Sequence, residues 1–390
     1  LVSVVALLFA TVLGFSSVWE SVGPVAGFTP ASGAASQWFD FDFTDGSTPV
    51  AAFSDQANFY KGTLVYFTNA GATTASLRTI KTGFSAGGIA YLALAVNPSN
   101  NKVFLVFSDQ TRIFKGSLMS SLTGAIPVTI SNGITSNSGQ EFSATVDNLT
   151  NLIIVFQDQK QQNKASAIKL NGSTFTYLGS PGFSSNFAGQ ISKVVIDTNN
   201  DKWVAFQEYG LGNVISLYKY TNAGNWFRKT YTFNRGSYPS LSTFKGNIYL
   251  SYRKDSDQKV YVMKYTNAGS LFTYGTNISV SSAKADFSSV AVGTNGVFFV
   301  YRDANIGNKL AVRQYMFNTT LTQANTNIAT YTNKVYPTNF VTNLKTATNN
   351  YTNYVCFTNT NLNTLISNVI TAVPVIQILQ LGGGYISNSI

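Results

Sequence analysis

The chain has 390 residues and a formal net charge of +10, yet only 11% of its residues are charged. That share is far below the usual quarter of a soluble protein. Lys and Arg occur singly rather than in long runs, which argues against a surface that binds nucleic acid. The sequence has no histidine and a single cysteine, Cys356. Histidine general bases, imidazole metal ligands and an intramolecular disulfide are therefore excluded, and we expect no cofactor.

The chain starts with an apolar stretch. Residues 1–19 carry no charge, Glu20 is the first ionisable side chain, and Pro24 would stop a helix. A helix of about 20 residues spans about 30 Å, the thickness of a bilayer core. We predict an apolar helix over residues 1–24, lying in a filament core or a membrane, and a linker over residues 25–37.

A cleaved secretion signal, a membrane anchor and a filament-forming helix all fit such a stretch. The start Leu1-Val2-Ser3-Val4-Val5-Ala6-Leu7-Leu8 resembles that of archaeal type IV pilins, whose apolar helix first lies in the membrane and then packs among its copies. The resemblance implies an assembly helix whose packing residues are Leu1, Ser3, Ala6, Ala10 and Gly14. Small residues spaced by three to four share one helix face and let neighbouring helices approach closely. A β-strand donated to a neighbouring subunit is the further alternative.

One motif recurs along the rest of the chain: an apolar strand that ends in an aromatic residue, then a polar or acidic residue, a loop, and a second strand near a lysine. The seven anchoring aromatics lie 46 to 56 residues apart, and they are Phe53, Phe107, Phe156, Phe206, Tyr252, Tyr301 and Phe357. A repeat near fifty residues that covers the whole chain indicates a repeat architecture.

Each unit divides into four short strands separated by turns rich in Asn and Gly. In the fourth unit we expect strands at residues 190–197, 202–207, 214–220 and 226–232. Four strands per fifty residues is the blade of a propeller. The predicted fold class is therefore mainly β: a seven-bladed β-propeller of four-stranded blades over residues 38–381, with the apolar helix before it and a tail at residues 382–390.

The ring needs an outer strand for its last blade. Residues 37–43 serve as the inner strand of the first blade, so we expect residues 373–381 to supply that outer strand.

The repeat resembles those of secreted microbial propeller proteins, in which a stretch such as Tyr177-Leu178-Gly179-Ser180-Pro181-Gly182-Phe183 links two blades. The resemblance implies an extracellular location and little about chemistry. Sialidase propellers would carry repeated Ser-x-Asp-x-Gly-x-x-Trp turns, and the sequence contains no copy of them.

Two further patterns concern single residues. Acid and lysine recur six residues apart in the pairs Asp55/Lys61, Asp109/Lys115, Asp158/Lys164 and Asp303/Lys309. Because a catalytic residue is usually needed once, this repetition favours structural pairs that hold a hairpin, contributing at most about 1 kcal/mol each if they are exposed. Glycosylation sequons start at Asn148, Asn171, Asn277, Asn318 and Asn350, mostly in predicted turns, and we predict sugar on at least some of Asn148, Asn171, Asn318 and Asn350.

No catalytic constellation is visible, so we expect a protein that is not an enzyme. The first functional expectation is a structural subunit of an extracellular type IV pilus-like filament with an adhesive role. Its partners would be copies of itself, cell-surface glycans, and the membrane before assembly. The alternatives are a membrane-anchored surface propeller that binds a carbohydrate or a partner protein, and a filament assembled by donor-strand exchange.

Overall fold

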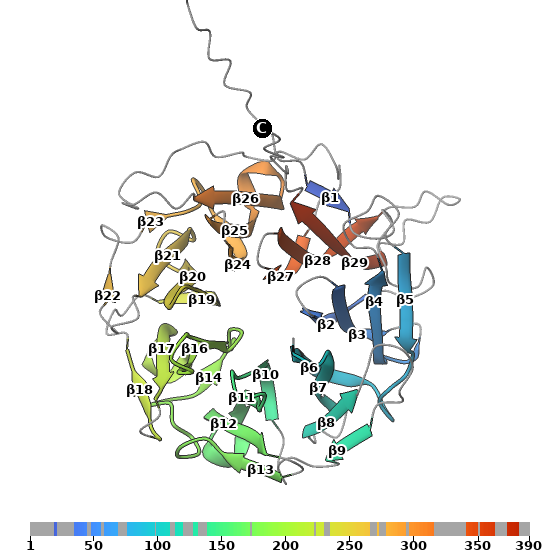
Figure 1. Cartoon of the computed structure of the whole chain (residues 1–390). Helices are drawn as coiled ribbons and strands as arrows, with labels where there is room; N and C mark the ends of the chain where they lie inside the picture. Colours follow the sequence, from blue (N-terminus) through green and yellow to red (C-terminus); the bar gives the residue numbers. More distant parts are fainter. Residues whose placement is uncertain are drawn as a thin grey trace, which may run out of the picture.

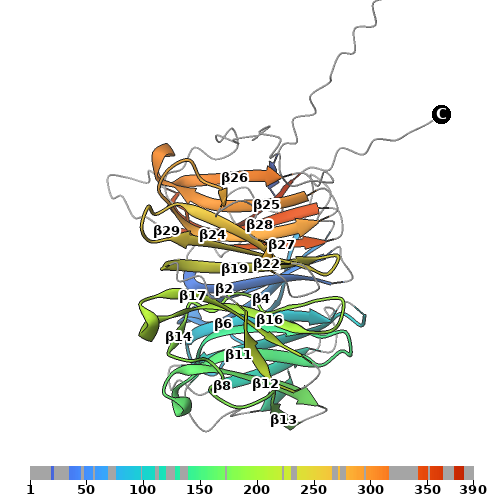
Figure 2. The same ribbon diagram turned by 90° about the vertical axis from the view of Figure 1, so that its left-hand side faces the viewer.

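The computed structural model of the chain describes residues 19–21, 35–44, 48–55, 58–68, 76–97, 99–109, 114–119, 128–131, 139–171, 174–221, 224–229, 235–265, 271–272, 278–293, 296–315, 341–349, 352–362 and 373–381. These residues form seven small antiparallel sheets that follow one another in chain order around a central axis (Figure 1). Seen from the side, the strands of successive sheets lie above one another (Figure 2). The chain is therefore mainly β, with the architecture of a propeller.

The first three sheets each have four strands. The first contains β2 (Ala35–Thr44), β3 (Thr48–Asp55), β4 (Lys61–Thr68) and β5 (Ser76–Lys81). The second contains β6 (Ile89–Asn97), β7 (Lys102–Asp109), β8 (Phe114–Met119) and β9 (Val128–Ser131). The third contains β10 (Gly139–Val146), β11 (Leu152–Asp158), β12 (Lys164–Asn171) and β13 (Thr174–Tyr177).

The next two sheets carry one short extra strand each. The fourth contains β14 (Ala188–Gly189), β15 (Val195–Ile196), β16 (Lys202–Glu208), β17 (Val214–Tyr220) and β18 (Trp226–Arg228). The fifth contains β19 (Gly236–Phe244), β20 (Asn247–Lys254), β21 (Val260–Tyr265), β22 (Leu271–Phe272) and β23 (Ile278–Ser279). The predicted third strand of the fourth unit has the bounds of β17. Its inner strand was predicted at residues 190–197, but the structure has two short strands there, and only β15 lies within those bounds.

The described part of the sixth sheet contains β24 (Ala285–Gly293), β25 (Gly296–Asp303) and β26 (Lys309–Tyr315). The seventh contains β27 (Val341–Asn349), β28 (Thr352–Leu362), β29 (Val373–Leu381) and, from the other end of the chain, β1 (Trp19–Ser21). Short 3-10 turns follow three second strands: η2 (Gln159–Gln161), η3 (Tyr209–Leu211) and η4 (Ala304–Ile306).

The innermost strands of neighbouring sheets contact one another around the axis, and β27 contacts β2, which closes the ring. Apolar side chains fill the space between sheets. Between the second and third sheets, for example, Phe104, Val106, Ile154 and Phe156 belong to one buried cluster. The second strands are buried on both faces because each sheet is covered by a neighbour on either side, which explains their continuous apolar runs.

The N-terminal segment completes the last sheet, which corrects two predictions. Trp19, Glu20 and Ser21 form a strand rather than the end of a helix, and they pair with Leu381, Gln380 and Leu379. Consequently β29 is the third strand of its sheet, and β1 is the outer one. Residues 1–18, including most of the predicted helix, lie outside the described residues. In the described part of the chain, no helix has the length and apolar character that crossing a membrane requires.

The recurrent acids are structural, and two of them, Asp55 and Asp158, also accept hydrogen bonds from hydroxyls. Asp55, Asp158 and Asp303 stand opposite lysines in the strand register, as expected, whereas Lys115 stands opposite Phe107 rather than Asp109. The carboxylates accept hydrogen bonds from hydroxyls eight residues later, 2.9 Å from Thr63 to Asp55 and 2.8 Å from Ser166 to Asp158. They are buried rather than exposed.

Replacing Asp158 with alanine is expected to lower the free energy of unfolding by about 2 kcal/mol, because the side chain is 1% exposed and accepts from three donors. These donors are the backbone N–H of Lys160 at the start of η2, the Ser166 hydroxyl and, at 3.4 Å, the Tyr177 hydroxyl. Urea denaturation followed by circular dichroism measures the loss. Asp158→Asn keeps one acceptor and should lose less. A loss under about 0.5 kcal/mol for Asp158→Ala would contradict the role of this carboxylate.

Candidate functional site

The candidate site begins with a bulge near the start of the innermost strands. The strand register shifts there in six sheets, for instance between Gln140 and Ser143 and between Ser237 and Ser240. At equivalent places in four sheets, the extra residue is in the left-handed backbone region: Glu141, Gln190, Tyr238 and Phe287, with φ between 46° and 56°. Such residues are rarely left-handed, and a bulge re-aims the side chain that it carries.

Six side chains, one from each of the first six sheets, lie at one end of the central axis: five are carried by these bulges, and Gln190 lies between β14 and β15. There they line a cavity of about 320 Å³. We call them the mouth residues: Trp38, Tyr91, Glu141, Gln190, Tyr238 and Phe287. All six are partly buried.

The mouth has two aromatic sides and a polar one. Trp38 and Tyr91 form one pair, with ring centroids 4.3 Å apart and planes tilted by 51°. Tyr238 and Phe287 form the other, with centroids 4.7 Å apart. In ring order, Glu141 and Gln190 come between the two pairs.

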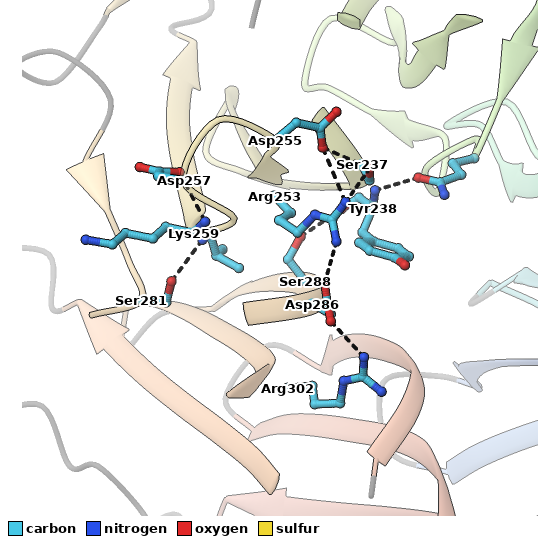
Figure 3. Close-up of polar contacts among 12 residues, drawn as sticks. Ser237, Tyr238, Arg253, Asp255, Asp257, Lys259, Ser281, Asp286, Ser288 and Arg302 are labelled. Atoms are coloured by element: carbon cyan, nitrogen blue, oxygen red, sulfur yellow. Dashed lines mark hydrogen bonds and ion pairs between the residues drawn. The ribbon is translucent and has the colours of Figure 1, made fainter. Parts of the chain in front are cut away.

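An Arg–Asp cluster, formed by Arg253, Asp286 and Arg302, supports the second aromatic pair (Figure 3). The Asp286 carboxylate accepts from Arg253 at 2.6 Å and from Arg302 at 2.7 Å. The Arg253 guanidinium lies 5.2 Å from the ring centre of Tyr238, and that of Arg302 lies 4.7 Å from the ring centre of Phe287. Arg253 thus joins the fifth sheet to the sixth through Asp286, and the two arginines position both rings.

Burial alone would raise the pKa of Asp286. Hydrogen bonds from Arg302 and Arg253 outweigh that effect, so the pKa of this carboxyl lies below its ordinary value. Asp286 is therefore ionised at neutral pH and balances part of the positive charge of the arginines.

Below the mouth, polar side chains connect neighbouring sheets. Asp40 accepts from the backbone of Leu94 at 3.0 Å, and Ser143 accepts from that of Val194 at 2.6 Å. These bonds satisfy backbone donors along the inner edges of the sheets, where the innermost strand has no neighbouring strand.

One ion pair crosses the axis. The Lys193 ammonium of the fourth sheet lies 3.4 Å from Asp42 of the first sheet. Burial would lower the pKa of Lys193, but the charges of Asp42 and Asp40 raise it above its ordinary value. Lys193 thus lines the cavity as a charged group with its counter-ion beside it.

The residues singled out from the sequence do not form this site. Asn148 lies exposed in the turn between β10 and β11, and Asn171 ends β12. Asn277, Asn318 and Asn350 lie outside the described residues, as do the assembly-helix residues Leu1, Ser3, Ala6, Ala10 and Gly14. Glycosylation stays a prediction.

Sequence reasoning missed the mouth residues and the Arg–Asp cluster. One pattern could have found the arginines: the residue after the anchoring aromatic is Gln157 or Gln207 in two units and Arg253 or Arg302 in the next two. Both glutamine amides donate to the backbone of the following sheet, to Ala188 and Gly236 respectively. In three of these four units the residue therefore bonds to the following sheet, whereas Arg302 bonds to Asp286 of its own sheet.

No protein-family model and no curated protein matches the chain. A solved protein of unknown function from Dyadobacter fermentans DSM 18053 is 11% identical, with a TM-score of 0.50 over 93% of this chain and 98% of that one. A fucose-specific lectin from Aleuria aurantia is 12% identical, with a TM-score of 0.47 over 74% of this chain and 94% of that one. A protein described as Hadza microbial sialidase Hz136 is 9% identical, with a TM-score of 0.49 over 69% of this chain and 63% of that one.

The Aleuria aurantia lectin is described as a six-bladed β-propeller, whereas the described strands form seven sheets here. At these identities, what the likeness shows is the fold: this chain is a β-propeller.

Proposed function

We propose that this protein is a carbohydrate-binding propeller that works outside the cell and binds one sugar ring at the mouth of its central cavity. The observation that carries the proposal is the pairing of aromatic rings on two sides of the mouth with an acid and an amide between them. The extracellular location is supported by the low charge content and the resemblance of the repeat to secreted propellers.

The mouth matches the two-sided chemistry of a sugar. A pyranose ring has an apolar face of C–H bonds, which packs on aromatic rings, and an edge of hydroxyls, which needs donors and acceptors. Trp38 with Tyr91, and Tyr238 with Phe287, offer the first surface. Glu141, Gln190 and the cavity serines such as Ser240 offer the second. A cavity of about 320 Å³ is at the lower end of ligand pockets and suits one ring.

The charges near the mouth favour a neutral sugar. Arg253 and Arg302 are bound to Asp286, and Lys193 is next to Asp42. An anionic ligand would have to compete with these carboxylates, and displacing either one would leave a partly buried acid unpaired.

We propose binding without turnover. The sequence has no histidine, and no group of three or more Cys, Asp or Glu side chains in the described ranges is placed to hold a metal ion. The filament role rests on residues 1–18 and stays a prediction. Display of the propeller on a cell surface is compatible with the proposed binding whether or not the chain polymerises.

Replacing Tyr238 with alanine is expected to weaken glycan binding at least about tenfold. The change removes one ring of the second aromatic pair and the ring on which the Arg253 guanidinium packs. A glycan array identifies the best ligand, and calorimetry with that glycan measures the affinity. The matched control is Phe227→Ala, which removes a ring that is 45% exposed on the outer strand β18. An array with no bound glycan, or equal affinities for Tyr238→Ala and the parent protein, would contradict the proposal.

A further inference from the structure

Two exposed aromatic rings lie next to the mouth, at the same end of the ring. Tyr209 is 44% exposed and Phe187 is 47% exposed. The start of each innermost strand pairs with the end of the second strand, as Ala188 pairs with Glu208. The hairpins after the second strands therefore lie at the same end of the propeller as the mouth.

The backbone holds Tyr209 and Phe187 together. The Tyr209 N–H donates to the Phe187 carbonyl at 3.1 Å. Tyr209 is the first residue of η3, which ends at Gly212 in the left-handed region with φ 80°, a conformation that glycine adopts at little cost. The backbone hydrogen bond to Phe187 and the η3 turn thus fix the backbone at Tyr209. Little conformational freedom of this segment is then lost when a ligand covers the ring.

A glycine makes room for the Tyr209 ring. A Cβ placed on Gly189 would stand 2.1 Å from a ring carbon of Tyr209. The ring thus lies directly over the backbone of β14. One face is supported by the protein, and the side chain remains 44% exposed.

Tyr209 also connects to the mouth, because Gly189 under its ring directly precedes the mouth residue Gln190. Burial raises the pKa of the Tyr209 hydroxyl, and the nearby Glu141 and Tyr238 raise it further. On its other side, Phe187 forms an isolated β-bridge with Lys164 at the start of β12. Tyr209 therefore lies between the mouth and Phe187, and we call Tyr238, Tyr209 and Phe187 the aromatic path; it runs outward toward β12 of the third sheet.

We propose that this aromatic path extends the sugar site, so that the protein binds a neutral linear oligosaccharide of about three units rather than a single terminal sugar. This inference rests on the proposed function. The path repeats the chemistry of the mouth, because an amide lies beside it: Asn186, the residue before Phe187, lies against Gly210, the residue after Tyr209. A surface on which aromatic faces alternate with amides suits a chain of sugar rings. The continuous apolar surface of a protein partner would leave the amides without hydrogen-bond partners.

Calorimetry with glucose, N-acetylglucosamine and mannose, each as the monosaccharide and as its β-1,4-linked oligomers of two to five units, tests the inference on the full chain. For the series that binds, we expect the affinity to rise at least about tenfold from one to three units and then to level off. Tyr209→Ala and Phe187→Ala should each remove most of this gain while keeping the monosaccharide affinity within about twofold.

Three further variants sharpen the test. Gly189→Ala should act like Tyr209→Ala, because its methyl group displaces the ring. Tyr209→Phe keeps the ring and should keep the gain with length, and Phe227→Ala should change nothing. Thermal midpoints equal to that of the parent show that each variant is folded.

The outcomes separate the two proposals. Equal affinities for monosaccharide and pentasaccharide would overturn the inference and leave the mouth as a single-sugar site. The inference also fails if Tyr209→Ala lowers monosaccharide and pentasaccharide affinities by the same factor. If none of these sugars and no glycan of a broad array binds, the proposed function itself is wrong, and capture of a protein through the exposed rings becomes the alternative to test.

Discussion

Replacing Asp286 with alanine should destabilise the propeller and abolish glycan binding together. The change leaves the guanidinium groups of Arg253 and Arg302 facing each other without the carboxylate that joins them. Both arginine side chains are mostly buried, at 23% and 19% exposed. Removing one partner of such a group costs about 2–4 kcal/mol of unfolding free energy. Binding is lost because both rings of the second aromatic pair lie on these arginines.

Urea denaturation and calorimetry measure the two effects. Asp255→Ala is the matched control, because Asp255 lies 3.3 Å from the same Arg253 but is the weaker partner. It should cost under about 1 kcal/mol and leave binding intact. An Asp286→Ala protein that is as stable as the Asp255→Ala protein would refute the role of the Arg–Asp cluster.

The same cluster predicts a pH dependence. The pKa of Asp286 is lowered in the folded protein, while the arginines stay charged throughout. The stability that ionised Asp286 contributes to the folded protein is therefore fully present above the ordinary carboxyl pKa of about 4. It is lost as the pH falls through the lower pKa that Asp286 has in the folded protein. The difference in unfolding free energy between the parent and Asp286→Asn should be constant from about pH 7 to 5 and shrink below about pH 4.

Removing residues 1–21 should make the propeller self-associate, whereas removing residues 1–17 should leave a monomer. Both truncations delete the apolar start, but only the longer one deletes β1, which pairs with Leu379, Gln380 and Leu381. The backbone groups of this end of β29 then form an open sheet edge in a strand of sequence VPVIQILQL. Such an apolar edge is a template for pairing with another chain.

Size-exclusion chromatography with light scattering reports the oligomeric state, and thermal unfolding reports the loss of the short strand, about 2 kcal/mol. If both truncations are equally stable monomers, β1 does not matter for closure. If the chain lacking residues 1–17 also polymerises, the apolar start is not what drives assembly, and the pilin-like prediction loses its basis.

Local patterns in the sequence determined the repeat and the positions of most strands. The second and third strands follow from runs of β-branched and aromatic residues between turns rich in Asn and Gly, and both are local properties. Residues 214–220 were predicted as a strand and form β17. The anchoring aromatics Phe53, Phe156 and Phe206 are all buried, because the apolar repeat itself requires burial.

Only the tertiary structure decided how the ring closes and where its site lies. The β1–β29 pairing joins Trp19 to Leu381, and three residues at the end of an apolar stretch carry no local mark of that partner. The mouth takes a single residue from each of six sheets, and the Arg–Asp cluster joins Arg253, Asp286 and Arg302. Within its repeat, each of these residues is one of the positions that vary, and no local motif marks it. Its role depends on the bulges and on closure of the ring, which bring distant repeats to one axis.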